Sequence, residues 1–200
     1  MKPDGIMPLF PRVVSTSFYP ESFDEELKYL RSLEYSSNGD MSPLQSMDTF
    51  VLDKPPMKKI RRFIESKIKK HVMKIFESKQ DLKITQSWVN KLTTNRFHSG
   101  HIHPNSYLSG VWYPVIDPSH PPIQFIDHSN FQMQLSGETS TELNSMVMSL
   151  TLEPGQLIVF PSNMFHRVLP NGTNSERISL SFNTWASGPL GEIENLTYAS

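Results

Sequence analysis

The sequence contains no cysteine, which excludes disulfides, thiolate metal ligands and a cysteine nucleophile. A metal site would have to use histidine, carboxylate or amide side chains. An excess of charge is also absent, because 19 Lys and Arg face 20 Asp and Glu, so an obligate nucleic-acid partner is not indicated. No apolar run approaches membrane-spanning length, and the amino terminus lacks the apolar core of a signal peptide. We expect a cytoplasmic protein without a membrane partner.

Two hundred residues are enough to bury one hydrophobic core, and a hydrophobic fraction of 37% is typical of a globular protein. The sequence contains no internal repeat and no low-complexity tract. The spacing of apolar residues changes near residue 81 from helical to alternating. We therefore expect a single domain over residues 1–200, with a helical lead-in (1–80), a β-rich core (81–186) and a C-terminal tail (187–200).

Two helices are predicted in the lead-in, which otherwise consists of an extended stretch (8–19) and a connecting loop (36–55). The first helix should begin at Ser22, because Ser22 and Glu25 form a capping-box pattern. The second follows Pro56 and carries one apolar stripe of Ile60, Ile64, Ile68, Val72 and Ile75. Its other face is rich in Lys and Arg without interleaved aromatic residues, so we interpret it as a solvated face rather than a nucleic-acid patch.

Short alternating apolar runs, separated by Pro, Gly, Asn and Ser, predict strands throughout the second half of the chain. The expected strands are 82–92, 107–115, 123–126, 131–134, 145–152, 157–160, 165–169 and 177–184. Crossover helices between them are absent, so a parallel sheet is not expected. The pattern predicts a mainly β sandwich or jelly roll, with the two N-terminal helices packed on it.

Histidines crowd the β-rich half, which holds six of the seven in the chain. His101 and His103 are two residues apart, and on an extended segment such residues face the same side. Both imidazoles can therefore face one ion, and neutral imidazole suits Fe, Zn, Cu or Ni. His166 heads a later predicted strand. We interpret the remaining members of this group as loop histidines: His98, His120 and His128.

Arg177 lies eleven residues after His166, on a strand of alternating apolar residues. A buried guanidinium is costly unless it is paired, and its planar fork fits a carboxylate. An anionic ligand is one possible partner, and a structural ion pair with Glu153 or Glu176 is the other. Arg177 shares its strand face with Ser179 and Ser181, so this face should line a pocket.

Two groups of residues form a pattern that resembles the iron(II)/2-oxoglutarate oxygenase superfamily. The first is His101-x-His103-Pro104 with Ser109-Gly110-Val111-Trp112-Tyr113, and the second is Phe160-Pro161, His166-x-Val168-x-Pro170 and Arg177-x-Ser179-x-Ser181-Phe182-Asn183. They are most similar to a branch of 2OG-Fe(II) oxygenases found in bacteria and tailed phages. The likeness covers about residues 82–185, with a fainter match at Leu9-Phe10-Pro11.

The resemblance implies a double-stranded β-helix that binds Fe(II) and uses 2-oxoglutarate as co-substrate. It makes His166 the distal iron ligand and Arg177, assisted by Ser179, the partner of the far carboxylate of 2-oxoglutarate. Asn95 and Tyr113 are further candidates for contact with the co-substrate. The implied reaction is oxidative decarboxylation to succinate and CO₂, coupled to hydroxylation or another oxidation of a second substrate.

The proximal motif departs from the superfamily, which places Asp or Glu where this chain has His103. The resemblance therefore implies a three-histidine site of His101, His103 and His166. In the alternative register His103 is the first ligand and Asn105 the second. Asp127 could fold back to supply a carboxylate, although it is more simply part of a turn.

Two other functions remain compatible with the sequence. One is a cupin-like metalloenzyme with three histidines that does not use 2-oxoglutarate, and the other is a non-catalytic jelly-roll binding module. The second substrate, whether small molecule or protein, would be selected by loops such as 36–57 and 117–144, which fold-level analogy does not reach. The sequence leaves the oligomeric state open as well.

Overall fold

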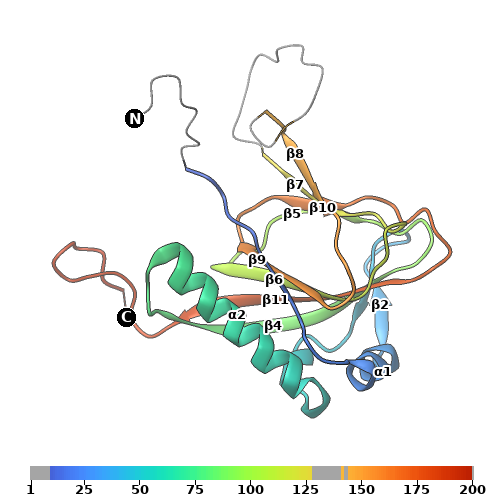
Figure 1. Ribbon diagram of the computed structural model, residues 1–200, viewed down its shortest axis with the longest axis horizontal. Coiled ribbons are helices and arrows are strands. Elements are labelled where there is room, and N and C mark those ends of the chain that lie inside the picture. Colours follow the sequence, from blue (N-terminus) through green and yellow to red (C-terminus); the bar gives the residue numbers. More distant parts are fainter. Residues whose placement is uncertain (1–9, 128–140, 142–143, 200) are drawn as a thin grey trace.

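The computed structural model describes residues 10–127, 141 and 144–199, and in these ranges the strands form two antiparallel sheets (Figure 1). The large sheet has the order β1-β9-β6-β11-β4-β3-β2, and the small sheet has the order β5-β10-β7-β8. The strands of the large sheet are β1 (Ser15–Phe18), β2 (Tyr35–Ser37), β3 (Leu44–Ser46), β4 (Asp81–Leu92), β6 (Leu108–Val115), β9 (Gln156–Pro161) and β11 (Arg177–Ser187). Those of the small sheet are β5 (His98–His101), β7 (Ile123–Ile126), β8 (Val147–Leu150) and β10 (His166–Val168).

Two hydrophobic layers hold these sheets and the helices together. One layer lies between the sheets and includes Ile158, Phe160 and Phe125. The other lies between the large sheet and the helices, and it receives Ile178 and Leu180 from β11. Because side chains alternate along a strand, Ser179, which lies between these two residues of β11, faces the small sheet instead.

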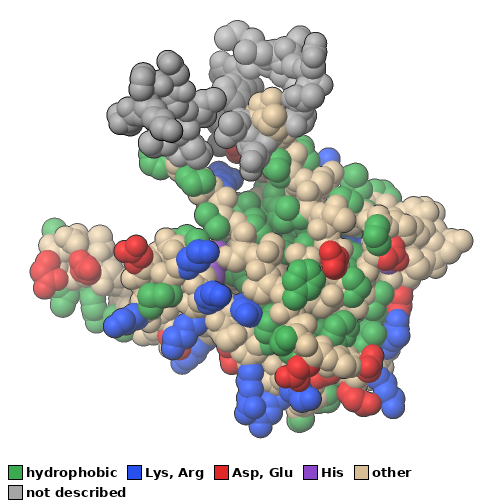
Figure 2. Space-filling view, in the orientation of Figure 1, with side chains coloured by type: hydrophobic (Ala, Val, Ile, Leu, Met, Phe, Trp, Pro, Cys, Tyr) green, Lys and Arg blue, Asp and Glu red, His purple; other side chains and the backbone are tan. Residues whose placement is uncertain are grey.

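The helices cover the outer face of the large sheet (Figure 1). They are α1 (Asp24–Ser32) and α2 (Lys58–Phe76), with two short 3₁₀ turns, η1 (Val51–Asp53) and η2 (Pro55–Met57), between them. The predicted apolar stripe of α2 is confirmed, since Ile60, Ile64, Ile68 and Val72 are buried. Figure 2 shows Lys and Arg side chains over the part of the surface where α2 lies. Among the described residues, no helix has both the length and the apolarity that a membrane span requires.

The N-terminal half differs from the sequence predictions in several details. The first helix begins at Asp24 rather than Ser22, and the capping box is absent because the Ser22 hydroxyl donates to the Asp24 carboxylate. The predicted loop 36–55 contains most of β2, all of β3 and η1, and the predicted extended stretch contains β1. These strands are short and polar, so their alternation is too brief to stand out in the sequence.

The β-rich half follows the prediction more closely. Seven of the predicted strands are present, with ends within three residues of the expected ones, while the predicted strand 131–134 lies outside the described residues. β5 was not predicted as a strand. Its pairing with β10 contains a bulge, because His166 lies opposite His101 and Val168 lies opposite His98. Three residues of β5 therefore span the same length as two of β10.

Candidate metal centre and anion pocket

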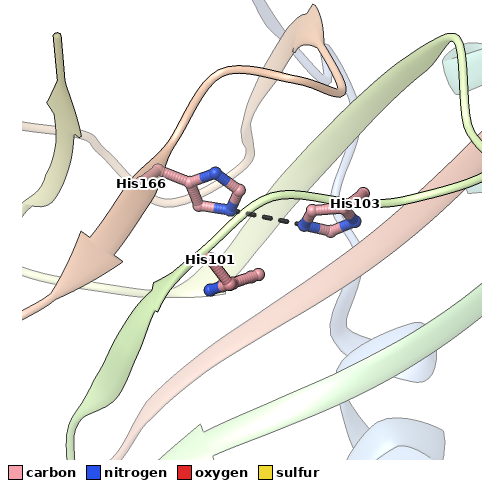
Figure 3. A group of neighbouring side chains, drawn as sticks. All are labelled: His101, His103 and His166. Carbon is pink, nitrogen blue, oxygen red and sulfur yellow. Dashed lines mark hydrogen bonds between the residues drawn. The ribbon is translucent and has the colours of Figure 1, made fainter. Parts of the chain in front are cut away.

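Three histidines meet at one end of the small sheet (Figure 3). His101 ends β5, His103 lies two residues beyond it, and His166 begins β10. The pairing of β5 with β10 sets His166 directly opposite His101, which explains why residues 65 positions apart become neighbours. The nitrogen atoms that could bind a metal lie within 4.8 Å of one another. The structure thus brings together the three histidines that were predicted from the sequence as metal ligands.

The hydrogen bonds of these imidazoles indicate which ring nitrogen carries the proton. Nδ1 of His101 lies 2.8 Å from the Ser99 carbonyl oxygen, and Nδ1 of His166 lies 2.9 Å from that of Met164. A carbonyl oxygen can only accept a hydrogen bond, so each Nδ1 must be protonated. In a neutral ring this leaves the lone pair on Nε2, the atom that is free to bind a metal.

His103 follows the same pattern with a side-chain partner, since its Nδ1 lies 2.6 Å from Oδ1 of Asn183. Its Nε2 lies 3.3 Å from Nε2 of His166, the contact drawn as a dashed line in Figure 3. With both Nδ1 atoms protonated and both rings neutral, two lone pairs face each other across this distance. A cation shared by the two nitrogen atoms would convert this repulsion into attraction, so the donor set fits a metal ion.

Burial keeps the three imidazoles neutral. Desolvation lowers the pKa of His103 to about 4 and that of His166 to about 3, with a smaller contribution to the latter from neighbouring His101. It also lowers the pKa of His101. At neutral pH all three rings are therefore uncharged, each with one nitrogen free of a proton before any metal arrives, as metal ligands must be.

Arg177 is the second chemical feature of the site, and only 2% of its surface is exposed. Its side chain lies over the Tyr113 ring at 5.1 Å from the centroid. Within the described part of the chain, its Nε and Nη2 atoms are buried without a hydrogen-bond partner. The alternative of an ion pair with Glu176 is wrong, because Glu176 pairs with Arg31 at 2.7 Å. Glu153, the other carboxylate considered, is exposed, and its backbone NH is bonded to Gln156.

One cavity between the sheets joins the histidines to Arg177. It is lined by Asn90, Leu92, His98, His101, His103, Val111, Tyr113, Ile123, His166, Val168, Arg177, Ser179 and Ser181. This confirms that Arg177, Ser179 and Ser181 share the face of β11 that lines a pocket. Among the described residues the lining contains a guanidinium and no carboxylate, so with a metal dication bound it would be strongly positive. Such a cavity favours an anionic ligand.

The remaining candidates from the sequence lie in different places. Tyr113 is in the cavity wall, where burial raises its pKa to about 12. Asn95 does not line the cavity: it is exposed in the turn after β4, with a φ of 65°. Asn105 is likewise exposed, with a φ of 55°, so the alternative register is not the one that the structure assembles. Asp127 is not in the histidine cluster, which contains no carboxylate among the described residues.

His98 is a cavity residue that the sequence interpretation missed, because it was taken for a loop histidine. Its ring centroid lies 4.3 Å from that of His101. Burial is the largest cause that lowers the pKa of His98 to about 3. Nearby charges lower it further, in decreasing order of effect those of His101, His166, His103 and Arg177. In a regular strand residues three apart face opposite sides, but the bulge in β5 turns His98 and His101 to the same side. Gly100 inside β5 is a sequence signal that could have indicated this bulge, since a glycine within a strand often marks one.

Comparison with known proteins gives one family match. Residues 86–183 match the family model described as "Putative 2OG-Fe(II) oxygenase". This segment contains the three histidines, Tyr113, Arg177 and Asn183. No curated protein matches the chain.

Solved structures with the same fold include three proteins at low sequence identity. HygX from Streptomyces hygroscopicus, described with nickel and 2-oxoglutarate bound, has a TM-score of 0.61 at 11% identity, covering 86% of this chain and 82% of its own. A Pseudomonas putida prolyl-4-hydroxylase has a TM-score of 0.58 at 14% identity, covering 88% and 94%. The carbocyclase SnoK from nogalamycin biosynthesis, described as α-ketoglutarate dependent, has a TM-score of 0.61 at 11% identity, covering 89% and 81%. These matches confirm the predicted double-stranded β-helix.

Proposed function

Residues 86–183 of this chain belong to the 2OG-Fe(II) oxygenase family, and on that premise we propose that the protein is a hydroxylase-type enzyme that uses Fe(II) and 2-oxoglutarate. The observation that carries the proposal is the pairing, within one cavity, of three neutral imidazoles with a buried arginine that has no counter-charge among the residues the structure describes. Imidazole nitrogens suit Fe(II), and an unpaired buried guanidinium suits a carboxylate. 2-Oxoglutarate supplies both an additional metal-binding group and that carboxylate.

In this proposal His101, His103 and His166 hold the iron through their Nε2 atoms. The third imidazole replaces the carboxylate that the wider superfamily uses, and this raises the net charge of the metal and its ligands by one unit. The dianionic co-substrate compensates this charge more strongly than a neutral ligand would. A three-histidine site therefore makes the enzyme more dependent on anion binding.

Arg177 holds the far carboxylate of 2-oxoglutarate. Its buried Nε and Nη2 atoms are the donors in need of a partner, and Ser179, which lies on the same strand face, adds a hydroxyl donor. The ring of Tyr113 packs against the guanidinium of Arg177. These residues bind and orient the co-substrate, and the surrounding apolar side chains of the cavity limit the access of water.

When bound, iron and 2-oxoglutarate supply the oxidising chemistry, in which O₂ is consumed, 2-oxoglutarate becomes succinate and CO₂, and the second substrate is oxidised. The neighbours show that one fold accommodates different outcomes, since their descriptions name a hydroxylase and a carbocyclase. Hydroxylation is the simplest such outcome, because it needs no second reactive group on the substrate. The chain's own residues position the reactants and keep the cavity closed to bulk water.

Calorimetric titration of 2-oxoglutarate into Ni(II)-loaded protein tests the proposal. Wild-type protein should bind 2-oxoglutarate, and succinate more weakly because it lacks the keto group. Arg177→Ala should weaken 2-oxoglutarate binding roughly thirty- to several-thousand-fold, since the loss of a buried charge pair costs about 2–5 kcal/mol. Arg177→Lys should restore little, because an ammonium cannot form the bidentate contact.

Arg31→Ala is the matched control, because Arg31 is exposed and pairs with the residue next to Arg177. This variant should bind 2-oxoglutarate like wild type. Metal content should be unchanged in all three variants. If metal-loaded wild type shows no heat of binding with millimolar 2-oxoglutarate, the oxygenase proposal is wrong and the cupin-like alternative replaces it.

A further inference from the structure

His103 differs from the other two histidines in how its proton is placed. Nδ1 of His101 and of His166 bonds to a backbone carbonyl oxygen two residues earlier in the chain. These partners belong to the local chain and can only accept. Nδ1 of His103 instead bonds to the side chain of Asn183, which lies 80 residues away on β11 of the large sheet. An amide side chain can present either its oxygen or its nitrogen, so the tautomer of His103 depends on Asn183.

A buried hydroxyl group contacts the same atom of the Asn183 amide as His103 does. The Ser109 hydroxyl donates to Oδ1 of Asn183 at 2.8 Å. Ser109 is in turn 2.8 Å from the Ser162 hydroxyl, which is the donor in this pair when the single proton of Ser109 lies on Asn183. Ser109 and Ser162 are 0% and 1% exposed, so water does not compete for these bonds.

Ser162 also holds the backbone of His103. The His103 N–H donates to the Ser162 carbonyl oxygen at 2.9 Å. Ser162 is thus linked to the backbone of His103 directly and to its imidazole through Ser109 and Asn183, so these hydrogen bonds form a closed ring. Trp88 stacks on the imidazole at a centroid distance of 5.7 Å, and Phe160 meets it edge-on. These contacts fix the plane of the ring.

We propose that Asn183 is the positioning residue that makes His103 a metal ligand, by accepting the Nδ1 proton and so keeping Nε2 free. Because the proposal concerns the metal site described under the proposed function, it rests on that function. If the amide were reversed, its NH₂ group would donate to Nδ1, and the proton of the neutral ring would move to Nε2, where it blocks the metal. In this site Asn183 therefore acts on the metal through the tautomer of His103, without adding charge.

The inference also predicts the effect of placing a carboxylate next to His103 instead of on the metal itself. A carboxylate at position 183 can only accept from Nδ1, and it increases the basicity of the imidazole that it contacts. Asn183→Asp should therefore keep or strengthen metal binding. Asn183→Leu, of similar size and without an acceptor, should weaken it about 10- to 100-fold, the usual cost of losing a hydrogen-bond partner behind a metal-bound histidine.

Nitrogen-15 NMR of the histidine rings in metal-free full-length protein reads the tautomers directly. Wild type and Asn183→Asp should show His103 protonated at Nδ1, as His101 and His166 are. In Asn183→Leu, His103 should become a mixture of tautomers or carry its proton on Nε2. The other two histidines should not change, since their partners are backbone atoms. A wild-type His103 that carries its proton on Nε2 would overturn the proposal.

Titration with Co(II), followed by its absorption, measures the consequence for metal affinity. Thr184→Val is the matched control, because Thr184 is the next residue of β11, is 0% exposed and bonds Leu108 rather than the site. It should be less stable to unfolding yet bind Co(II) like wild type. If Asn183→Leu does not fold, Ser109→Ala, which removes one donor to Oδ1, should still show a smaller loss of affinity.

The results separate this inference from the proposed function. Equal Co(II) affinity in Asn183→Leu and wild type would overturn the role of Asn183 and leave the oxygenase proposal standing. The opposite result is a wild type that binds Co(II) but not 2-oxoglutarate, together with a tautomer change in Asn183→Leu. It would overturn the oxygenase proposal and leave the role of Asn183 standing. Co(II) affinity reduced in Asn183→Leu, retained in Asn183→Asp and unchanged in Thr184→Val supports the inference.

Discussion

Two groups in the cavity lack partners that their chemistry requires. In the part of the chain that the structure describes, Arg177 is buried without a counter-charge. With Nδ1 of both rings protonated, the facing Nε2 atoms of His103 and His166 have no proton between them. A buried polar group without a hydrogen bond costs about 1–3 kcal/mol, and more if it is charged. A fold that retains both features gives up stability at this point. A metal dication and an anionic ligand together would satisfy both.

Single substitutions should identify the ligand set. His166→Ala should abolish binding of Fe(II), and His101→Ala or His103→Ala should weaken it severely, because each removes one of three neutral donors. Asn105→Ala should have little effect, since Asn105 is exposed. The measurement is metal content after anaerobic loading, expected at about one ion per chain for the intact site.

His71→Ala is the control for this series, because it removes a buried histidine that is remote from the cluster in the fold. It should leave the metal content at the wild-type value. Unchanged metal content in His166→Ala would disprove the assignment of the centre. A severe loss in Asn105→Ala together with none in His101→Ala would move the site by two residues.

At the scale of the elements, the sequence predicted regular strands and missed their irregularities. The alternation on β11 was sufficient to place Arg177 in the cavity and Ile178 in the layer under the helices. The bulge in β5 reversed the expectation for His98, because one extra residue changes the side to which a strand residue points. Gly100 within β5 permits such a bulge, but its position in the pairing is set by the tertiary contact with β10.

The network around Asn183 was also beyond prediction from the sequence. Its position was noted as part of the family pattern, but its role depends on the meeting of three segments that are far apart in the chain: Ser109 on β6, Ser162 after β9 and Asn183 on β11. Residues that bind a metal have characteristic side chains, whereas those that orient them are ordinary serine and asparagine. Their function becomes visible when hydrogen-bond partners are known.

The contact of α2 with the edge of the large sheet should depend on pH. His71 on α2 is 3% exposed and bonds through Nδ1 to the Ser15 hydroxyl of β1 at 2.7 Å. Burial lowers the pKa of His71 below its usual 6.5. The groove beside it is lined by three lysines and, among the described residues, no carboxylate: Lys67, Lys70 and Lys74. Protonation of His71 in the folded state is therefore disfavoured.

The sign of the effect follows from linkage. Well above pH 6.5, His71 is neutral in both the folded and the unfolded chain and adds no pH dependence. As the pH falls below 6.5, the unfolded chain takes up a proton that the folded chain does not, so the free energy of unfolding decreases, by at most about 1.4 kcal/mol per pH unit. His71→Leu removes this contribution. The free energy of unfolding of wild type relative to His71→Leu should thus fall between pH 7.5 and pH 5.

Denaturant titrations at the two pH values measure this difference. Ser15→Ala provides the control, because it breaks the same hydrogen bond, worth about 0.5–1.5 kcal/mol, but keeps the histidine. Its stability should be lower at both pH values and retain the wild-type pH dependence. Parallel pH profiles for wild type and His71→Leu would show that protonation of this histidine is not coupled to folding.

For the whole molecule, the site is a connection between the two sheets. The histidines come from β5, the loop after it and β10, on the side of the small sheet, while Arg177 comes from β11 of the large sheet. The hydrophobic layer between the sheets also reaches the site, with Phe160 of the large sheet in ring contact with Phe125 and His166 of the small sheet. A metal bound by the histidines and a ligand that bridges it to Arg177 would join the sheets across this layer.

Stability against heat should therefore rise in two separable steps. A ligand at one hundred times its Kd stabilises the folded state by about 2.7 kcal/mol, which for a chain of this length corresponds to a rise in Tm of about 5–10 °C. Metal alone should give the first rise, through the histidines. 2-Oxoglutarate should give a second rise when metal is present and little without it, because the co-substrate needs both Arg177 and the metal.

The variants should remove these steps selectively, as measured by differential scanning calorimetry. Arg177→Ala should keep the metal step and lose the 2-oxoglutarate step, whereas His166→Ala should lose both. Asn183→Leu should require more metal for the first step and, once metal is saturating, should show the second step in full, because Asn183 acts on His103 and not on the anion. An equal 2-oxoglutarate step in metal-free and metal-loaded wild type would show that the co-substrate binds apart from the metal, and the connection between the sheets would then consist of Arg177 alone.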